Sequence, residues 1–492
     1  MSNPFRFLTL MLIFALSTVS LGNPLVANRA VAAQWEQKVD PWVLQTAAGQ
    51  SETEFLVFLA EQADLSATEA MQTKLEKGTY VYETLTALAE HTQKPVIAQL
   101  EGLGVEYRSF WVANMIWVRG NSTIAQTMAQ RADVAHVFAN PVVPFEALPE
   151  EEKEALLSPD TVEWNIAMVN ADDVWAEGVT GQGAVIGGQD TGYDWDHPAL
   201  IDQYRGWDGA NANHSYNWHD AIHSGGGSCG PDSPEPCDDY GHGTHTMGIM
   251  IGDDGGTNQI GMAPGAQWIG CRNMDQGNGT PATYSECYQW FIAPTDLNDE
   301  NPDPSKAPDV INNSWGCPVS EGCTDPNVLL AVVQAVRAAG ILTAHSAGNS
   351  GAGGCGTVNT PSAIYGESFT VGSTTNTNTL SGFSSRGPVT VDGSNRLKPD
   401  ISAPGSGIRS SLRGGGYGGM SGTSMAAPHV AGLVGLLISA NPALAGQVDL
   451  VEDIIEQTAV PVTVSPVQTC GGIPSTEIPN NTFGWGRMDA YA

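Results

Sequence analysis

Ser424 lies in the stretch G-T-S-M-A-A-P-H, between a glycine turn and residues 425–440, which are predicted to form a helix. Pro428 is expected in the first turn of this helix, where its missing N–H is tolerated. Backbone N–H groups and the helix dipole favour negative charge at such a position, which suits a nucleophile whose attack creates an oxyanion. A serine more commonly just caps the helix there, so Ser424 alone leaves the question open.

Two further motifs supply a base and an acid. Asp190 follows the apolar stretch 183–189 and is expected at the C-terminal end of a strand, where open α/β sheets place functional groups. His242, in G-H-G-T-H, is expected at the start of a helix, between glycines that permit close approach. The purely structural alternative is that Asp190 is a turn residue and that His242 and Ser424 cap helices. This alternative does not account for the presence of all three motifs in this order.

The three motifs D-T-G, G-H-G-T-H and G-T-S-M-A-A-P-H-V-A-G resemble those of the subtilisin-like serine proteases. The resemblance covers about residues 164–492, and its details are most similar to the bacillopeptidase F-like branch. It implies a secreted serine endopeptidase that hydrolyses peptide bonds in proteins and peptides through an acyl-enzyme. Ser424 would be the nucleophile, His242 the general base and then acid, and Asp190 the group that orients and stabilises the imidazolium.

The same resemblance assigns two binding elements. Asn349, in S-A-G-N-S-G, matches the family's oxyanion-hole asparagine and would donate beside the backbone N–H of Ser424. A turn asparagine is the structural alternative. Ser314, Trp315 and Gly316 match the strand that pairs with an extended substrate. The family commonly has leucine where Trp315 stands, so the substrate specificity is left open.

Other hypotheses fit less well. Cys229, Cys237, His242 and His245 lie close in sequence, but their spacing fits no usual zinc pattern. A sedolisin-like peptidase would replace His242 by glutamate and Asn349 by aspartate. An α/β-hydrolase esterase would need G-x-S-x-G around its serine. A catalytically silent pseudoprotease or binding module is the non-enzyme alternative, and an intact triad gives it little support.

Composition and the first residues indicate export. The 492-residue chain is 41% hydrophobic and has a net charge of −33, from 53 acidic and 20 basic residues, which speaks against nucleic acid or an anionic membrane as partner. Residues 1–33 resemble a secretory signal, with Arg6, an apolar segment over 7–21 and cleavage near Ala33. No later apolar run is long enough for a membrane span. We therefore expect a secreted, unanchored monomer.

The eight cysteines form an even set, and an exported chain would use them as disulfides. Two pairs would close short Gly/Pro-rich loops, a third would tie a strand to the next helix, and the fourth is left by elimination. Sequence alone cannot prove this connectivity, because eight cysteines allow many. The expected pairs are Cys229–Cys237, Cys317–Cys323, Cys271–Cys287 and Cys355–Cys470.

The chain divides into four segments, of which residues 1–33 are the signal. Residues 34–145 contain no cysteine, and their predicted β-α-β-β-α-β order indicates a small ferredoxin-like α+β domain. The family resemblance implies that this domain is an inhibitory prosegment. Residues 146–163 form a charged linker with the processing site, which the enzyme itself is expected to cleave. Strands and helices alternate in residues 164–492, which favours a parallel α/β sheet with helices on both sides.

The chemistry needs no cofactor, and structural calcium stays an open question. Many family members have an aspartate ligand after the His-Pro that follows the catalytic aspartate, whereas Ala199 stands here. Alanine offers no side-chain oxygen, and Ca²⁺ needs about six to eight oxygen ligands. Asp253 and Asp254 could host a substitute, or could be solvated surface carboxylates. The sequence therefore assigns no metal ligand.

Overall fold

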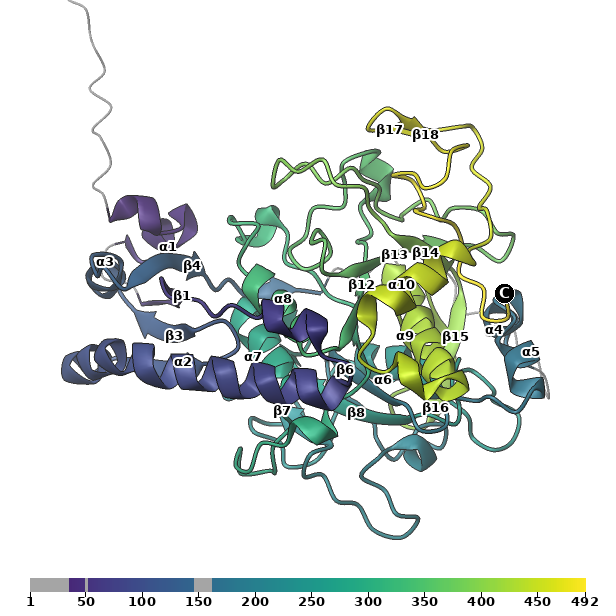
Figure 1. Ribbon diagram of the computed structural model, residues 1–492, viewed down its shortest axis with the longest axis horizontal. Coiled ribbons are helices and arrows are strands. Elements are labelled where there is room, and N and C mark those ends of the chain that lie inside the picture. The colour runs from purple at the N-terminus through teal and green to yellow at the C-terminus, as the bar shows by residue number, and fades with distance from the viewer. Residues whose placement is uncertain (1–34, 49–51, 146–161) are drawn as a thin grey trace, which may run out of the picture.

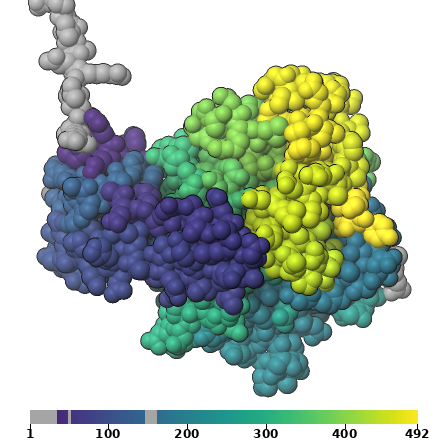
Figure 2. Space-filling view, in the orientation of Figure 1, coloured from purple at the N-terminus to yellow at the C-terminus, as the bar shows by residue number. Residues whose placement is uncertain are grey.

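The computed structural model describes residues 35–48, 52–145 and 162–492. The predicted signal (1–33) and almost all of the predicted linker (146–163) lie outside the described residues. Figure 1 shows an N-terminal module at one end of the molecule, in purple and blue, and a larger α/β unit beside it. In Figure 2 the atoms of the two parts abut along one side of the module.

The N-terminal module is a four-stranded antiparallel sheet with the strand order β2-β3-β1-β4. Helix α2 begins at a capping box formed by Thr73 and Glu76 and ends before Gly104, which has φ 66°. From β1 to β4 the chain order is β-α-β-β-α-β, as expected for a ferredoxin-like domain, and a short helix α1 precedes it. Its elements are α1 (Pro41–Thr46), β1 (Thr53–Leu59), α2 (Lys74–Leu103), β2 (Glu106–Phe110), β3 (Met115–Gly120), α3 (Ser122–Ala129) and β4 (Val134–Ala139).

The larger unit is built on a seven-stranded sheet in which every neighbouring pair is parallel. The predicted parallel α/β fold is therefore confirmed. In spatial order the strands are β14 (Ile401–Pro404), β13 (Phe369–Thr374), β12 (Leu342–Ser346), β11 (Val310–Asn313), β6 (Val185–Asp190), β8 (Gln267–Arg272) and β7 (Trp218–Asp220).

Helices cover both faces of this sheet. Val310 and Ile311 are adjacent in β11 yet belong to different apolar clusters, because successive side chains of a strand point to opposite faces. Helices α6 and α9 pack on the Val310 face, and α7 and α8 on the other. The helices are α4 (Trp164–Met168), α5 (Ala171–Ala176), α6 (His242–Ile251), α7 (Pro281–Ile292), α8 (Leu330–Ala338), α9 (Thr423–Ala440) and α10 (Val448–Gln457).

The expectation that no later apolar run is long enough for a membrane span was wrong as to length, because helix α9 has the length and apolar composition of one; 83% of it, however, is buried within the protein. It runs beside five strands of the sheet (β6 and β11–β14) and is the central core helix of the unit. The remaining strands are short: β5 (Val143–Pro144), β9 (Met274–Asp275), β10 (Asn278–Gly279), β15 (Ile408–Leu412), β16 (Gly416–Met420), β17 (Thr469–Cys470) and β18 (Ile473–Pro474).

The module docks on the face formed by α7 and α8. Val81 and Leu85 of α2 belong to the same apolar cluster as Tyr288 of α7 and Val332 of α8. The N–H of Ala282, in the first turn of α7, donates to the side chain of Asn140 in the module at 2.8 Å. One orphan N–H of a helix N-terminus is thus satisfied across the interface.

Four disulfides join the cysteines, and no described cysteine is free. Cys229 is bonded to Cys237, so its thiolate is not available for the zinc site considered above. The observed pairs are the four expected ones: Cys229–Cys237, Cys271–Cys287, Cys317–Cys323 and Cys355–Cys470.

Candidate active site

Asp190 and His242 meet where a strand ends and a helix begins. Asp190 is the last residue of β6 and His242 the first of α6. The Asp190 Oδ1 and His242 Nδ1 atoms lie 2.7 Å apart, and both side chains are buried. Oδ1 of Asp190 also accepts the N–H of Thr191 at 2.8 Å. The carboxylate therefore accepts the Nδ1–H of the imidazole, orients the ring and fixes the proton on Nδ1.

The glycine after His242 allows this approach. A Cβ on Gly243 would lie 2.1 Å from the carbonyl oxygen of Gly192 and 3.0 Å from the Cβ of Asp190. Any side chain there would push α6 away from the Asp190 loop. The other ring nitrogen, Nε2, is buried and has no hydrogen-bond partner among the described residues. It is the atom that a general base would use.

Ser424 lies in the first turn of α9, because the helix begins at Thr423 rather than at 425. Pro428 is consequently in the second turn, not in the first as predicted. Proline lacks the N–H that would bond the carbonyl four residues before it, which here belongs to Ser424. That carbonyl accepts instead the hydroxyl of Ser314 at 2.9 Å. The proline thus frees a backbone group that ties Ser424 to the segment after β11.

The Ser424 hydroxyl donates to the carbonyl oxygen of Ser314 at 3.3 Å rather than to His242. Catalytic hydrogen bonds are often long or misdirected until substrate is bound, so this geometry does not argue against the pair. Ser424 is 5% exposed. It lines one cleft with Asn349 and with the predicted substrate-binding residues Ser314, Trp315 and Gly316.

Asn349 lies at the mouth of this cleft, just beyond the end of β12. Its Oδ1 accepts both the N–H of Thr423 at 2.9 Å and the Thr423 hydroxyl at 3.0 Å. A backbone N–H can only donate, so these bonds assign the oxygen to that side. The amide nitrogen consequently points away from Thr423 and is available as a donor to an oxyanion beside Ser424.

The segment after β4 of the module enters the same cleft. Strand β5 pairs with β10 in antiparallel register, with Val143 opposite Gly279, and the Phe145 N–H donates to Gly277 O at 2.6 Å. The Phe145 ring lies 4.1 Å from the imidazole of His242. Sequence analysis matched Ser314, Trp315 and Gly316 to the strand that pairs with a substrate but did not predict β10, because a two-residue strand has no pattern of its own.

Trp315 does not project into solvent. Its ring stacks on that of Tyr284 at 3.8 Å with an interplanar angle of 13°, and it is 4% exposed. Trp315, which stands where the family commonly has leucine, therefore connects helix α7 to the wall of the cleft. Tyr284 was not among the predicted site residues, since nothing in the sequence pairs it with Trp315.

A cluster of charged side chains outside the cleft lies where the module meets α7. Glu286 Oε1 contacts Nε2 of both His219 and His223, at 3.1 and 2.7 Å, and Arg108 of the module lies 3.0 Å from Glu286 Oε2. Burial lowers the pKa of His219, but the carboxylates of Asp299 and Glu286 outweigh it and raise the pKa to about 9. Burial raises the pKa of Glu286, but its two histidine partners outweigh it and lower the pKa to about 2.

At Ala199 the chain offers no side-chain oxygen to a calcium ion. Ala199 is buried and offers only its carbonyl oxygen, which accepts the N–H of Asp253. Arg409 places a positive charge by the loop that follows Asp253. Its guanidinium donates to Asn258 Oδ1 at 2.6 Å and to Glu163 at 2.8 Å. Burial raises the pKa of Glu163, and Arg409 opposes that effect.

Comparison with known proteins agrees with this geometry. Residues 181–486 match the model of the Subtilase family. The chain is 37% identical over 453 residues to bacillopeptidase F of Bacillus subtilis (strain 168), and the match covers 88% of this chain but 29% of that protein. It is 30% identical over 408 residues to subtilisin E of the same strain, covering 82% of this chain and 91% of subtilisin E. The chain therefore belongs to the subtilase family of serine peptidases.

Proposed function

We propose that the protein is a secreted serine endopeptidase, made as a precursor that processes itself. Ser424 Oγ attacks the carbonyl carbon of a peptide bond while His242 Nε2 takes its proton. The imidazolium, held by Asp190, then gives that proton to the leaving amine, and water hydrolyses the acyl-enzyme by the reverse roles. The Asn349 amide and the Ser424 N–H stabilise the negative oxygen formed at each attack. Export is supported by the leader-like residues 1–33 and by the four disulfides.

The observation that carries the proposal is the course of residues 143–145. They run as a strand beside β10 and bring Phe145 against His242, as an extended substrate would approach the cleft. The module would then inhibit in cis, with its C-terminal segment occupying the cleft as substrate and afterwards as product. Its protein partner would thus be its own prosegment until the module is degraded.

The test compares the wild-type precursor with Ser424→Ala in a protease-free host. The wild type should yield a mature enzyme that cleaves casein, and the variant should accumulate as full-length precursor. A residue that contacts the catalytic imidazole lies within about two positions of the bond being cleaved, so the mature chain should start at residue 146, 147 or 148. Normal processing of the variant would refute self-maturation. If fluorophosphonate treatment of the wild type then also left Ser424 unlabelled, a silent pseudoprotease would be favoured.

We also propose that the region of Ala199 needs no calcium, because Arg409 supplies its positive charge. EDTA should leave the melting temperature of the mature enzyme, freed of its module, unchanged, whereas Arg409→Ala should lower its free energy of unfolding by about 2–4 kcal/mol, since Glu163 would stay buried without its partner. Arg409→Lys is the matched control and should recover part of the loss. A fall in melting temperature with EDTA that added calcium reverses would contradict the proposal.

A further inference from the structure

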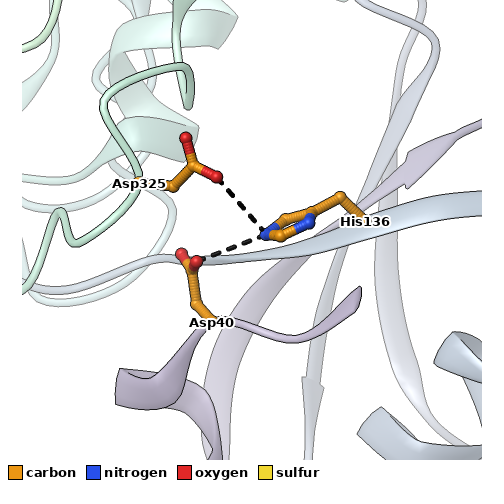
Figure 3. A group of neighbouring side chains, drawn as sticks. All are labelled: Asp40, His136 and Asp325. Carbon is orange, nitrogen blue, oxygen red and sulfur yellow. Dashed lines mark hydrogen bonds and ion pairs between the residues drawn. The ribbon is translucent and has the colours of Figure 1, made fainter. Parts of the chain in front are cut away.

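Three potential metal ligands meet where the module contacts the larger unit. Asp40 precedes α1, His136 lies in β4, and Asp325 lies in the loop between Cys323 and α8. One ligand atom of each lies within 4.8 Å of the other two. Figure 3 shows both carboxylates directed at the same ring nitrogen, Nε2 of His136. Two ligands thus come from the module and one from the catalytic unit.

The contacts of His136 with the two carboxylates are longer than is typical of charge-assisted hydrogen bonds. His136 Nε2 lies 3.3 Å from Asp40 Oδ1 and 3.7 Å from Asp325 Oδ2. Charge-assisted N–H···O bonds are typically about 2.7–2.9 Å long. Ligands placed about 2.0–2.2 Å from a tetrahedral zinc ion lie about 3.3–3.6 Å from one another. The 3.3 Å distance lies within this range and the 3.7 Å distance just above it, so both are closer to the spacing of ligands around an ion than to that of charge-assisted bonds.

The remaining oxygens of both carboxylates are already held. Asp40 Oδ2 accepts the N–H of Ala139 at 2.8 Å. Asp325 Oδ1 accepts the backbone and side-chain N–H groups of Asn327 at 2.8 and 3.0 Å. The His136 ring packs on Phe138, with centroids 4.3 Å apart. Such outer contacts orient metal ligands, and here they leave one oxygen of each carboxylate facing the imidazole.

We propose that Asp40, His136 and Asp325 bind one Zn²⁺ ion that joins the module to the catalytic unit. Two carboxylates and one imidazole are a ligand set for zinc, with water as the fourth ligand, and the ion's charge balances both carboxylates. Ca²⁺ takes oxygen ligands only, so the histidine selects against it. If the module is an inhibitor, the ion slows its release. That consequence rests on the function proposed above, whereas binding itself does not.

The test uses the full-length Ser424→Ala precursor, freed of metal, so that binding is measured without any processing. Calorimetric titration with ZnCl₂ should show one equivalent bound. His136→Gln and Asp325→Asn should each weaken binding at least tenfold, while His91→Gln, which changes an exposed histidine of α2, should not. Zinc binding that survives His136→Gln, or calcium binding with the same dependence on His136, would overturn the proposal.

A cobalt titration of the same precursor keeps the test informative if a ligand variant fails to fold. Co²⁺ in a tetrahedral site absorbs visible light far more strongly than octahedral Co²⁺, so one equivalent should give an intense band that zinc abolishes. A weak octahedral spectrum at saturation would contradict the site. Circular dichroism melts without metal should be alike for the precursor and its folded variants.

Discussion

In both the catalytic centre and the cluster where the module meets α7, carboxylates contact histidine side chains. The two regions differ in whether a ring nitrogen of the imidazole is left without a partner. In the centre, Asp190 holds Nδ1 of His242, while Nε2 has no partner among the described residues. At the docking face, both nitrogens of His219 and of His223 contact carboxylates. An imidazole with one unpaired nitrogen is free to exchange a proton with a bound substrate or a nucleophile, whereas one paired with carboxylates on both sides is stabilised in its charged form. The comparison separates a catalytic role from a structural one.

Removing the negative charge in the centre should have the largest effect. Asp190→Asn leaves the shape of the site intact but favours the wrong tautomer of His242, so kcat should fall by about 10⁴ with little change in KM. Steady-state kinetics of the mature enzyme with a peptide amide would measure it. Asp232→Asn is the matched control at the other Asp–His contacts and should leave kcat within about twofold. An equal loss in both variants would break the comparison.

Asn349→Ala should have the next largest effect. The change removes the Asn349 side-chain amide, whose orientation Thr423 fixes. The kcat should therefore fall by about 10²–10³, a figure known from subtilisin. Because the oxyanion exists only during reaction, KM should change little. Asn349→Asp tests the charge: an acceptor in place of the donor should be at least as harmful. A change confined to KM would assign Asn349 to substrate binding instead.

The positions of Asp190, His242 and Ser424 were predictable because each lies in a short motif whose chemistry constrains its neighbours. Asp190, His242 and Ser424 fall at the end of β6 and the starts of α6 and α9, where apolar runs and glycines had placed them. The alternation of strands and helices likewise predicted the parallel sheet. Local pattern is informative wherever a residue's role depends on the element that carries it.

Contacts between segments far apart in sequence could not be predicted in the same way. Phe145 reaches His242, and Arg409 reaches Glu163, only through tertiary packing between segments far apart in sequence. Strands β13 and β14 were missed too, since they lie among Gly- and Ser-rich loops and their burial comes from α9. The start of α9 was misplaced by two residues, because Pro428 suggested a first turn where the structure has a second.

Breaking the docking face from the module side should have a smaller effect. Arg108→Ala removes the module's cation from Glu286, and the cleaved module should dissociate about tenfold faster, as for a partly exposed charge-assisted contact. The lag before activity appears after dilution of the processed complex measures this. Arg119→Ala is the matched control, because Arg119 flanks the same Trp117 ring but pairs with Glu54 inside the module. Equal lags for both variants would show that the Arg108 contact does not hold the module.

The smallest expected effect is a dependence of stability on pH. The pKa of His219 is raised to about 9 in the folded protein, from an ordinary value of 6.5. A raised pKa contributes stability that is fully present below about pH 6.5 and is lost as the pH rises through about 9. One pKa unit corresponds to about 1.4 kcal/mol, but Asp299 is 68% exposed and solvent screens its contribution, so we expect a loss on the order of 1 kcal/mol.

Urea unfolding of the Ser424→Ala precursor at pH 6 and at pH 9 would measure this loss while the module stays covalently attached. His219→Asn should be less stable at pH 6 and should show a smaller difference between the two pH values. His91→Asn should keep the difference seen in the precursor. A histidine bonded to carboxylates on both sides is stabilised in its charged form, so its contribution must decline with rising pH. If His219→Asn left the pH difference intact, the charged imidazole would not hold the docking face together, and the contrast with His242 would lose its physical basis.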